Sequence, residues 1–197
     1  MKIFSRIYYL IEENEVTNMK KDFRLFFDMD DTLTDFSKGD SEFLTKMYEE
    51  GYFLDLKPFP FLNEVNKIAA FCPENIFIIS ACLQTPFCRK EKTEWLKKNL
   101  PAAMKENILF TRVGKAKHNF VKWKLHRKID KYDILIDDYS KNLIEWENAG
   151  GTAIKFKNGF NTKDPSKYKY IISNFSELLD VITIIRNDLE EERKCKH

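Results

Sequence analysis

Two apolar segments of this chain end in pairs of acidic residues, and this feature restricts its fold more than any other. Arg24 to Phe27 lead into Asp28 and Asp30, and Ile134 to Ile136 lead into Asp137 and Asp138. Side chains alternate along a strand, so Asp28 and Asp30 are expected to project toward one pocket as the chain leaves it. Functional groups gather at the carboxyl ends of parallel strands. The repeated pattern therefore predicts two strand ends that converge in an open α/β sheet.

Two simpler explanations of the first acidic pair deserve a test. An EF-hand calcium loop starting at Asp28 needs Gly at its sixth position and Glu at its twelfth, where this chain has Leu33 and Gly39. That explanation fails at both positions. A solvated Asp-rich turn would account for the first pair. It does not account for a second apolar strand that also ends in acids.

Strand-like and helix-like segments alternate along the rest of the chain, which predicts a parallel α/β sheet. Strands are expected at 24–29, 75–80, 108–111, 133–137 and 152–156, and helices at 42–50, 60–71, 89–99, 116–125, 140–149 and 176–191. A length of 197 residues fits one domain with its own core. We expect residues 1–18 to be an extension and residues 19–197 to form the domain.

Composition excludes several classes of protein. The formal charge is only +2, which gives no field that would attract a nucleic-acid polymer or an anionic membrane. The four cysteines lack C-x-x-C spacing, which argues against zinc and fits reduced thiols. No apolar run is long enough to span a bilayer, and the first residues do not form a convincing signal peptide. A soluble, cytoplasmic protein is expected.

The segment from residue 36 to about residue 60 lies between the first strand and the next helix and is rich in aromatic residues. It is a candidate cap over the pocket. Most of its rings are expected to form the small core of the cap itself. Phe36 differs, because it follows the first acidic pair so closely that its ring should border the pocket. Stacking on a planar substrate group is a natural role for such a ring.

The first acidic pair suits phosphoryl transfer. Asp28 is the candidate nucleophile, because an aspartate can attack phosphorus and hold the group as an acyl phosphate until water releases it. Asp30 is the candidate general acid and base, which protonates the leaving alkoxide and then deprotonates water. Asp137 and Asp138, with Asp28 and the backbone carbonyl of Asp30, are the oxygen ligands expected to hold Mg²⁺.

Phosphate-binding groups are expected near these acids. Ser80 ends the second predicted strand, and its hydroxyl is a candidate ligand for a phosphoryl oxygen. Charge on the phosphoryl oxygens also calls for a fixed cation. Lys117 is preferred and Lys115 is the alternative, because both come just before or at the start of a predicted helix whose amino end favours anions. Leu109 and Ala116 exclude a Walker A loop here.

Taken together, these motifs resemble the four ordered motifs of the haloacid dehalogenase superfamily, over roughly residues 23 to 160. The matching residues are Asp28-x-Asp30-x-Thr32, Ser80, a lysine near position 117 and Asp137-Asp138. The resemblance implies a three-layer α/β/α core with a Rossmann-like parallel sheet. It also implies a small helical cap inserted after the first strand.

Within that superfamily the chain resembles the 5′(3′)-deoxyribonucleotidase family, particularly its bacterial and phage members. The resemblance rests on residues 28–36, 51–58 and 135–143, with Trp146, Glu147, Gly150 and Gly151. The chain departs from the pattern at Asp31, where many relatives have Gly, and at Tyr139, where some have Arg. These departures leave substrate preference open, and Lys128 also stays open as the phosphate lysine.

The family resemblance implies a Mg²⁺-dependent phosphatase of nucleoside monophosphates that prefers deoxyribonucleotides. Phe36 and Phe53 would then enclose the base, and Lys92 would be a further lysine on the phosphate side. A phosphatase of the same fold acting on a sugar phosphate is the alternative. A catalytically silent nucleotide-binding protein is disfavoured by the intact acids. The expected partner is a small phosphomonoester, and a homodimer is left open.

Overall fold

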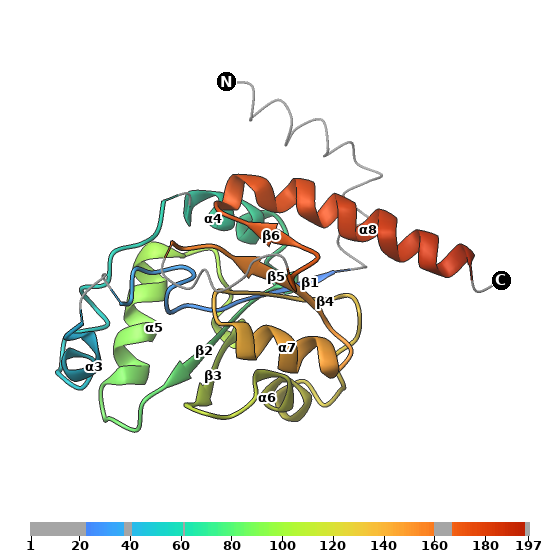
Figure 1. The fold of residues 1–197 in the computed structure, drawn as a ribbon. Coiled ribbons are helices and arrows are strands. Elements are labelled where there is room, and N and C mark those ends of the chain that lie inside the picture. The colour runs from blue at the N-terminus through green and yellow to red at the C-terminus, as the bar shows by residue number, and fades with distance from the viewer. Residues whose placement is uncertain (1–22, 38–40, 61, 160–166, 196–197) are drawn as a thin grey trace, which may run out of the picture.

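The structure is a computed structural model that describes residues 23–37, 41–60, 62–159 and 167–195. Its centre is a six-stranded sheet with the order β3-β2-β1-β4-β5-β6, in which every neighbouring pair is parallel (Figure 1). The strands are β1 (Arg24–Phe27), β2 (Ile76–Cys82), β3 (Ile108–Arg112), β4 (Asp133–Asp137), β5 (Thr152–Phe156) and β6 (Ile171–Ile172). The expected extension, residues 1–18, lies outside the described residues.

Helices cover both faces of the sheet. The α-helices are α3 (Phe43–Lys46), α4 (Leu62–Phe71), α5 (Cys88–Asn99), α6 (Lys117–Lys124), α7 (Ser140–Asn148) and α8 (Leu178–Lys194), and the short 3₁₀ turns are η1 (Pro73–Asn75), η2 (Lys105–Asn107) and η4 (Phe175–Glu177). Buried residues of α4, α5 and α8 share one apolar cluster, and those of α6 and α7 share another. Figure 1 shows these groups on opposite sides of the sheet, which confirms the three-layer α/β/α arrangement.

Strand β1 lies in the middle of the sheet and contributes to both apolar clusters. Leu25 and Phe27 point into one cluster and Phe26 into the other, as alternation along a strand requires. Phe27 is in register with Ile78 of β2 and with Ile136 of β4. This register places the residue after β1 beside the end of β4. The two acidic strand ends therefore lie side by side.

The loop that leads from α7 into β5 depends on a glycine. Trp146 is fully buried, and its indole nitrogen donates a hydrogen bond of 2.9 Å to the backbone oxygen of Asp133. A Cβ atom on Gly151 would lie 2.3 Å from that nitrogen. Any larger residue at position 151 would displace the ring that covers this face of β4, because packed cores leave no room for it.

Five of the six strands agree with the predicted segments, and the sixth was not predicted. Strand β6 is only two residues long, too short to produce a recognisable alternation. The helix expected at 42–50 is also shorter, since α3 contains only four residues and is followed by turns and bends as far as Asp55. The aromatic rings of the segment between β1 and α4 pack on one another instead of forming one face of a long helix.

The segment between β1 and α4 is joined at its base. The backbone nitrogen of Asp35 donates to the oxygen of Lys57 at 2.9 Å, and the nitrogen of Phe59 donates to the oxygen of Leu33 at 2.9 Å. Thr34 and Pro58 form an antiparallel bridge between these two bonds. The two ends of the segment thus lie together, and the residues between them form the candidate cap.

Two expectations from composition concern thiols and membranes. All four cysteines lie in the described residues and none forms a disulfide. Among the helices described here, none has both the length and the apolar character needed to cross a bilayer.

Asp133 forms a buried ionic cluster at the amino end of β4. Its carboxylate is fully buried and contacts Arg24 Nε at 2.5 Å and Arg127 Nη2 at 2.6 Å. The backbone nitrogen of Asp130 donates a further bond of 2.8 Å. Burial alone would raise the pKa of Asp133, but the hydrogen bonds from Arg127 and Arg24 outweigh it and lower the pKa. This cluster stabilises the end of β4 opposite to the acidic pair.

We predict that Asp133→Asn lowers the free energy of unfolding at neutral pH by about 2 kcal/mol, because a charged acceptor of several hydrogen bonds is lost. A carboxyl group with a lowered folded-state pKa stabilises the protein above its unfolded pKa, here near 3.8. The difference between wild type and variant should therefore shrink as the pH falls through the folded-state pKa. Urea unfolding across this pH range measures it.

The matched control is Asp130→Asn, because the Asp130 side chain is 53% exposed and also pairs with Arg24. Its effect should stay below about 1 kcal/mol, as for other exposed ion pairs. Equal unfolding energies for Asp133→Asn and wild type at neutral pH would contradict the proposed role of the cluster.

Candidate active site

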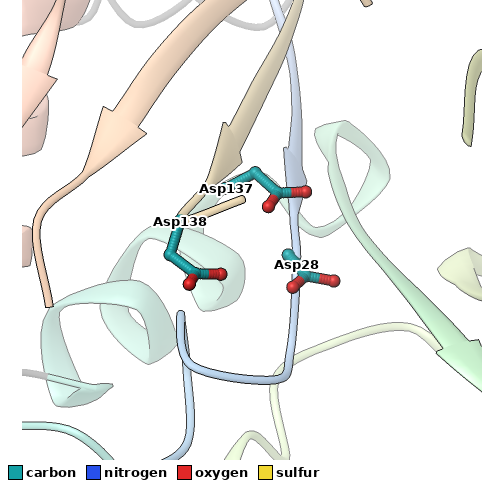
Figure 2. Close-up of side chains that lie close together, drawn as sticks. All are labelled: Asp28, Asp137 and Asp138. Carbon is teal, nitrogen blue, oxygen red and sulfur yellow. The ribbon is translucent and has the colours of Figure 1, made fainter. Parts of the chain in front are cut away.

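Three carboxylates meet where β1 and β4 end. Figure 2 shows Asp28 after β1 and Asp137 and Asp138 at the end of β4, with their carboxylates directed into the same space. One oxygen from each lies within 4.8 Å of the others, and all three side chains are buried. The backbone nitrogen of Asp28 donates to the oxygen of Ile136 at 2.9 Å, which fixes the two strand ends together. The convergence predicted from the repeated pattern is present.

Lys117 lies between two of these carboxylates. Its ammonium contacts Asp28 Oδ1 at 2.5 Å and Asp137 Oδ2 at 2.6 Å. The side chain is buried, and burial by itself would lower the pKa of Lys117, yet attraction to Asp137 and Asp28 raises it. This lysine stays charged and holds the candidate nucleophile. It begins α6, so the amino end of that helix also faces the acids.

The pKa of Asp28 is raised to about 7, because burial and the neighbouring Asp137 and Asp30 carboxylates together outweigh the lowering effect of Lys117. Lys117 bonds to Asp28 and Asp137, and the buried Lys155 is attracted to Asp138 and Asp137, so two lysines face these three acids. Carboxylate oxygens are the ligands that Mg²⁺ prefers, and a bound divalent cation would favour the ionised form of each acid. The donor set therefore fits a hard divalent cation.

The turn after β1 presents the first acidic pair. The backbone nitrogens of Leu33 and Thr34 both donate to the oxygen of Met29, at 2.9 and 3.0 Å. Asp31 has a φ of 55°, in the left-handed region that Asp tolerates better than most residues. Gly adopts this backbone conformation more readily than Asp, so the departure at Asp31 does not require another shape of the turn. Asp31 accepts a 2.9 Å bond from the backbone of Ser37, which fixes the turn further.

Thr32 joins the two acidic strand ends. Its hydroxyl accepts a 3.1 Å bond from the backbone nitrogen of Asp138 and donates to Asp138 Oδ1 at 3.4 Å. Thr32 is completely buried. The third residue of the motif therefore orients Asp138 directly.

Asp30 is held by Lys92 from α5. The Lys92 ammonium donates to Asp30 Oδ2, to Ser80 Oγ at 2.9 Å and to the backbone oxygen of Ala81 at 2.8 Å. The other carboxylate oxygen, Asp30 Oδ1, is buried and has no hydrogen-bond partner in the described residues. An oxygen left free in this way suits proton exchange with a substrate or water. The carboxylate of Asp30 does not join the cluster of the other three acids.

A cavity of about 530 Å³ opens onto these groups. It is lined by the reactive acids, by both candidate lysines, by cap residues and by the start of α7, including Asp28, Asp30, Asp138, Lys115, Lys117, Phe36, Phe43, Tyr139 and Asn142. The expectation that Phe36 borders the pocket is met by this arrangement. A cavity of this size is typical of sites for small organic ligands.

Three expected substrate ligands lie behind the cavity. Ser80 and Lys92 are buried and bond to each other, and neither lines the cavity. Phe53 is 1% exposed, stacks on Phe36 with ring centroids 6.0 Å apart, and has the Lys92 ammonium 4.8 Å from its ring. In this conformation these residues support Asp30 and Phe36. Direct contacts of Ser80, Lys92 and Phe53 with substrate stay predictions.

Glu91 fixes the cap to the core. Its carboxylate is buried and accepts bonds from the backbone nitrogens of Gly51 at 2.6 Å and Phe53 at 3.2 Å. Trp95, one turn further along α5, donates from its indole nitrogen to the oxygen of Leu56 at 2.6 Å. The cap is therefore anchored to one helix by bonds to its backbone.

The sequence analysis missed three polar residues of the site. Lys155 is buried, and its ammonium donates to the backbone oxygen of Asp138 and to Ser140 Oγ at 3.5 Å. Asn142 donates to Asp137 Oδ2 at 2.9 Å, and Asn158 donates to Asp138 Oδ2 at 3.1 Å. A lysine inside the otherwise apolar β5 was the available signal, because a buried strand admits a charge only when it is paired.

Solved structures show the same fold. A haloacid dehalogenase family hydrolase of Deinococcus radiodurans, with bound phosphate and sodium, matches with a TM-score of 0.60 and 12% identity, covering 83% of this chain and 96% of that one. A haloacid dehalogenase-like hydrolase of Streptococcus pneumoniae matches with a TM-score of 0.57 and 12% identity, over 81% and 97%. A family IA, variant 3 hydrolase of Entamoeba histolytica gives 0.57 and 13%, over 83% and 99%. These matches show that the chain has the haloacid dehalogenase fold.

A match to a protein-family model assigns the chain to a specific family. Residues 39–188 match the family described as 5′ nucleotidase, deoxy (pyrimidine), cytosolic type C protein. The chain belongs to this family, and it is a phosphatase. The matched residues begin after Asp28 and Asp30, so those two acids rest on the geometry described above. A comparison with curated proteins found no match.

We predict that Lys117→Met lowers phosphatase turnover by at least about 100-fold, because a fixed charge at the reacting group is lost. Lys115→Met is the matched control. Lys115 lines the same cavity but is exposed and makes no ion pair among the residues described here. Its loss should change KM more than kcat. Steady-state kinetics on p-nitrophenyl phosphate distinguish the two lysines, and a larger loss of kcat from Lys115→Met would reverse the assignment.

Proposed function

We propose that the protein is a Mg²⁺-dependent 5′(3′)-deoxyribonucleotidase that releases phosphate from deoxyribonucleoside monophosphates. The observation that supports this most is the content of one cavity. Asp28, Asp30 and Lys117 line it together with the Phe36 ring, so phosphoryl chemistry and a surface for a planar base occur in the same space. Membership of the deoxy 5′ nucleotidase family points to the same substrate class. Cysteines that form no disulfide suit a cytoplasmic location.

The reaction follows from the positions of the two acids of the turn. Asp28 attacks phosphorus, the bond from phosphorus to the leaving oxygen breaks, and Asp30 gives its proton to that oxygen. Asp30 then takes a proton from water, whose oxygen attacks phosphorus and releases Asp28 and inorganic phosphate. Lys117 stays beside Asp28 throughout and balances charge on the phosphoryl oxygens. Asp28, Asp137 and Asp138 would hold the cation, which when bound would supply further positive charge to the phosphoryl group.

The substrate class is tested by hydrolysis of a panel that contains deoxyribonucleoside monophosphates, ribonucleoside monophosphates and sugar phosphates, with Mg²⁺ and with chelator. The expected kcat/KM is highest for a deoxyribonucleoside monophosphate. Asp28→Asn should lower turnover by at least about 1,000-fold, since the attacking group is removed. Faster turnover of sugar phosphates than of any nucleotide would make the protein a sugar-phosphate phosphatase. Binding of nucleotide without any turnover would make it a binding protein.

Phe36 tests base recognition in the same assay. Phe36→Leu keeps the apolar volume but removes the ring, and stacking of a base on a ring contributes about 1–3 kcal/mol. The KM for nucleotides should therefore rise about tenfold, by the same energy, while the KM for deoxyribose 5-phosphate, which has no planar ring, stays within about twofold. A parallel rise for both substrates would show that Phe36 only supports the cap.

We predict that Mg²⁺ binding stabilises the folded protein independently of turnover. At a concentration of about 100 times its dissociation constant, a ligand specific for the folded state contributes about 2.7 kcal/mol, which appears as a higher Tm. Asp138→Asn should abolish most of this shift. Asp31→Asn is the matched control, because Asp31 lines the cavity without belonging to the three-carboxylate cluster. Equal Mg²⁺ shifts in both variants would place the cation elsewhere.

A further inference from the structure

A second cavity, of about 620 Å³, lies beside the catalytic cavity. Its walls come from the segment after β2, the start of α5, the end of β3 and α6, and it contains Trp123. Thr111 and Lys115 line both cavities. We call this second cavity the Trp123 pocket. The proposed catalytic steps use none of its other residues.

The charge of the Trp123 pocket is entirely positive. Arg89, Arg112 and Lys115 line it, and none of its lining residues is acidic. Within the part of the chain that the structure describes, none of these three cations forms an ion pair. Three cations around one cavity without a carboxylate favour an anionic ligand, and arginines are suited to binding phosphate oxygens in pairs.

The same pocket is rich in aromatic rings. The Arg89 guanidinium lies 5.4 Å from the ring centroid of Phe110. The rings of Phe120 and Trp123 pack on each other with their centroids 5.5 Å apart. Trp123 is 68% exposed although it is among the largest apolar side chains. The other two tryptophans, Trp95 and Trp146, are 1% and 0% exposed. An exposed indole on the wall of a cationic cavity is suited to stacking on a planar ring.

We propose that the Trp123 pocket binds a nucleotide in addition to the one processed in the catalytic cavity. Arg112 and Lys115 receive the phosphate, and Trp123 with Phe120 receives the base. The volume lies within the range of about 300–1,000 Å³ that is usual for sites of small organic ligands. The shared Lys115 places the second nucleotide next to the catalytic cavity. The count of two nucleotides per chain rests on the proposed function, whereas binding at the Trp123 pocket does not.

Fluorescence measures binding at this pocket, because Trp123 is the one exposed tryptophan of the three. The protein carries Asp28→Asn so that the probe, deoxyguanosine monophosphate, is not consumed. The nucleotide should quench the indole emission saturably. Trp123→Phe, added to the same background, should remove the quenching. Persistent quenching in that variant would assign the signal to the buried tryptophans and overturn the proposal.

Calorimetry with the same nucleotide counts the sites. Two nucleotides per chain are expected, and one should be lost or weakened at least about tenfold by Arg89→Ala with Arg112→Ala. Lys90→Ala is the matched control, because Lys90 is exposed on the same helix and lines neither cavity. In the chain with an intact Asp28, the double variant should hydrolyse p-nitrophenyl phosphate within about twofold of wild type, since neither arginine lines the catalytic cavity. That activity also shows that the variant is folded.

The outcomes separate this proposal from the catalytic one. One nucleotide per chain that depends on Arg89 and Arg112 would support the Trp123 pocket and contradict nucleotide binding in the catalytic cavity. One nucleotide per chain that is insensitive to these arginines would overturn the pocket alone. Deoxyribose 5-phosphate that binds the pocket as tightly as the nucleotide would overturn recognition of the base.

Discussion

The site depends on one buried balance of charge, in which Lys117 lies between Asp28 and Asp137. The parallel pairing of β1 and β4 forces the two carboxylates together, and burial removes the water that would otherwise stabilise them. A single ammonium group then bonds to both. Because Lys117 begins α6, the connection from β3 must deliver this helix to the carboxyl edge of the sheet. The order of the strands therefore determines where the buried charges of the site meet.

A second set of buried groups keeps the reactive groups in place. Lys92 holds Asp30 by one of its carboxylate oxygens and leaves the other free, and Thr32 holds Asp138. Lys155 holds the backbone beyond β4. Such supporting bonds restrict the rotamers of the groups that face the cavity, which is how a site reaches the precision that phosphoryl transfer requires. The haloacid dehalogenase fold supplies the strand ends, and these side chains supply the alignment.

Sequence patterns predicted most of the sheet and the central acids, because buried parallel strands leave long apolar runs and functional groups follow them directly. Lys117 was preferred for its position before a helix, and the structure places it on Asp28. The roles of Ser80, Lys92 and Phe53 depend on which side of a packed layer each side chain occupies, and no periodicity encodes that. Lys155 in β5 and Asn158 after it both reach Asp138, and although a lysine in a buried strand signals a partner, nothing local in the sequence says which partner it is.

Two adjacent residues of α5 form hydrogen bonds to different parts of the site. Glu91 accepts hydrogen bonds from the backbone of the cap, and Lys92 donates a hydrogen bond to the carboxylate of Asp30. Side chains at successive helical positions are attached to one rigid backbone. The position of the cap and the alignment of the proton donor therefore both depend on α5.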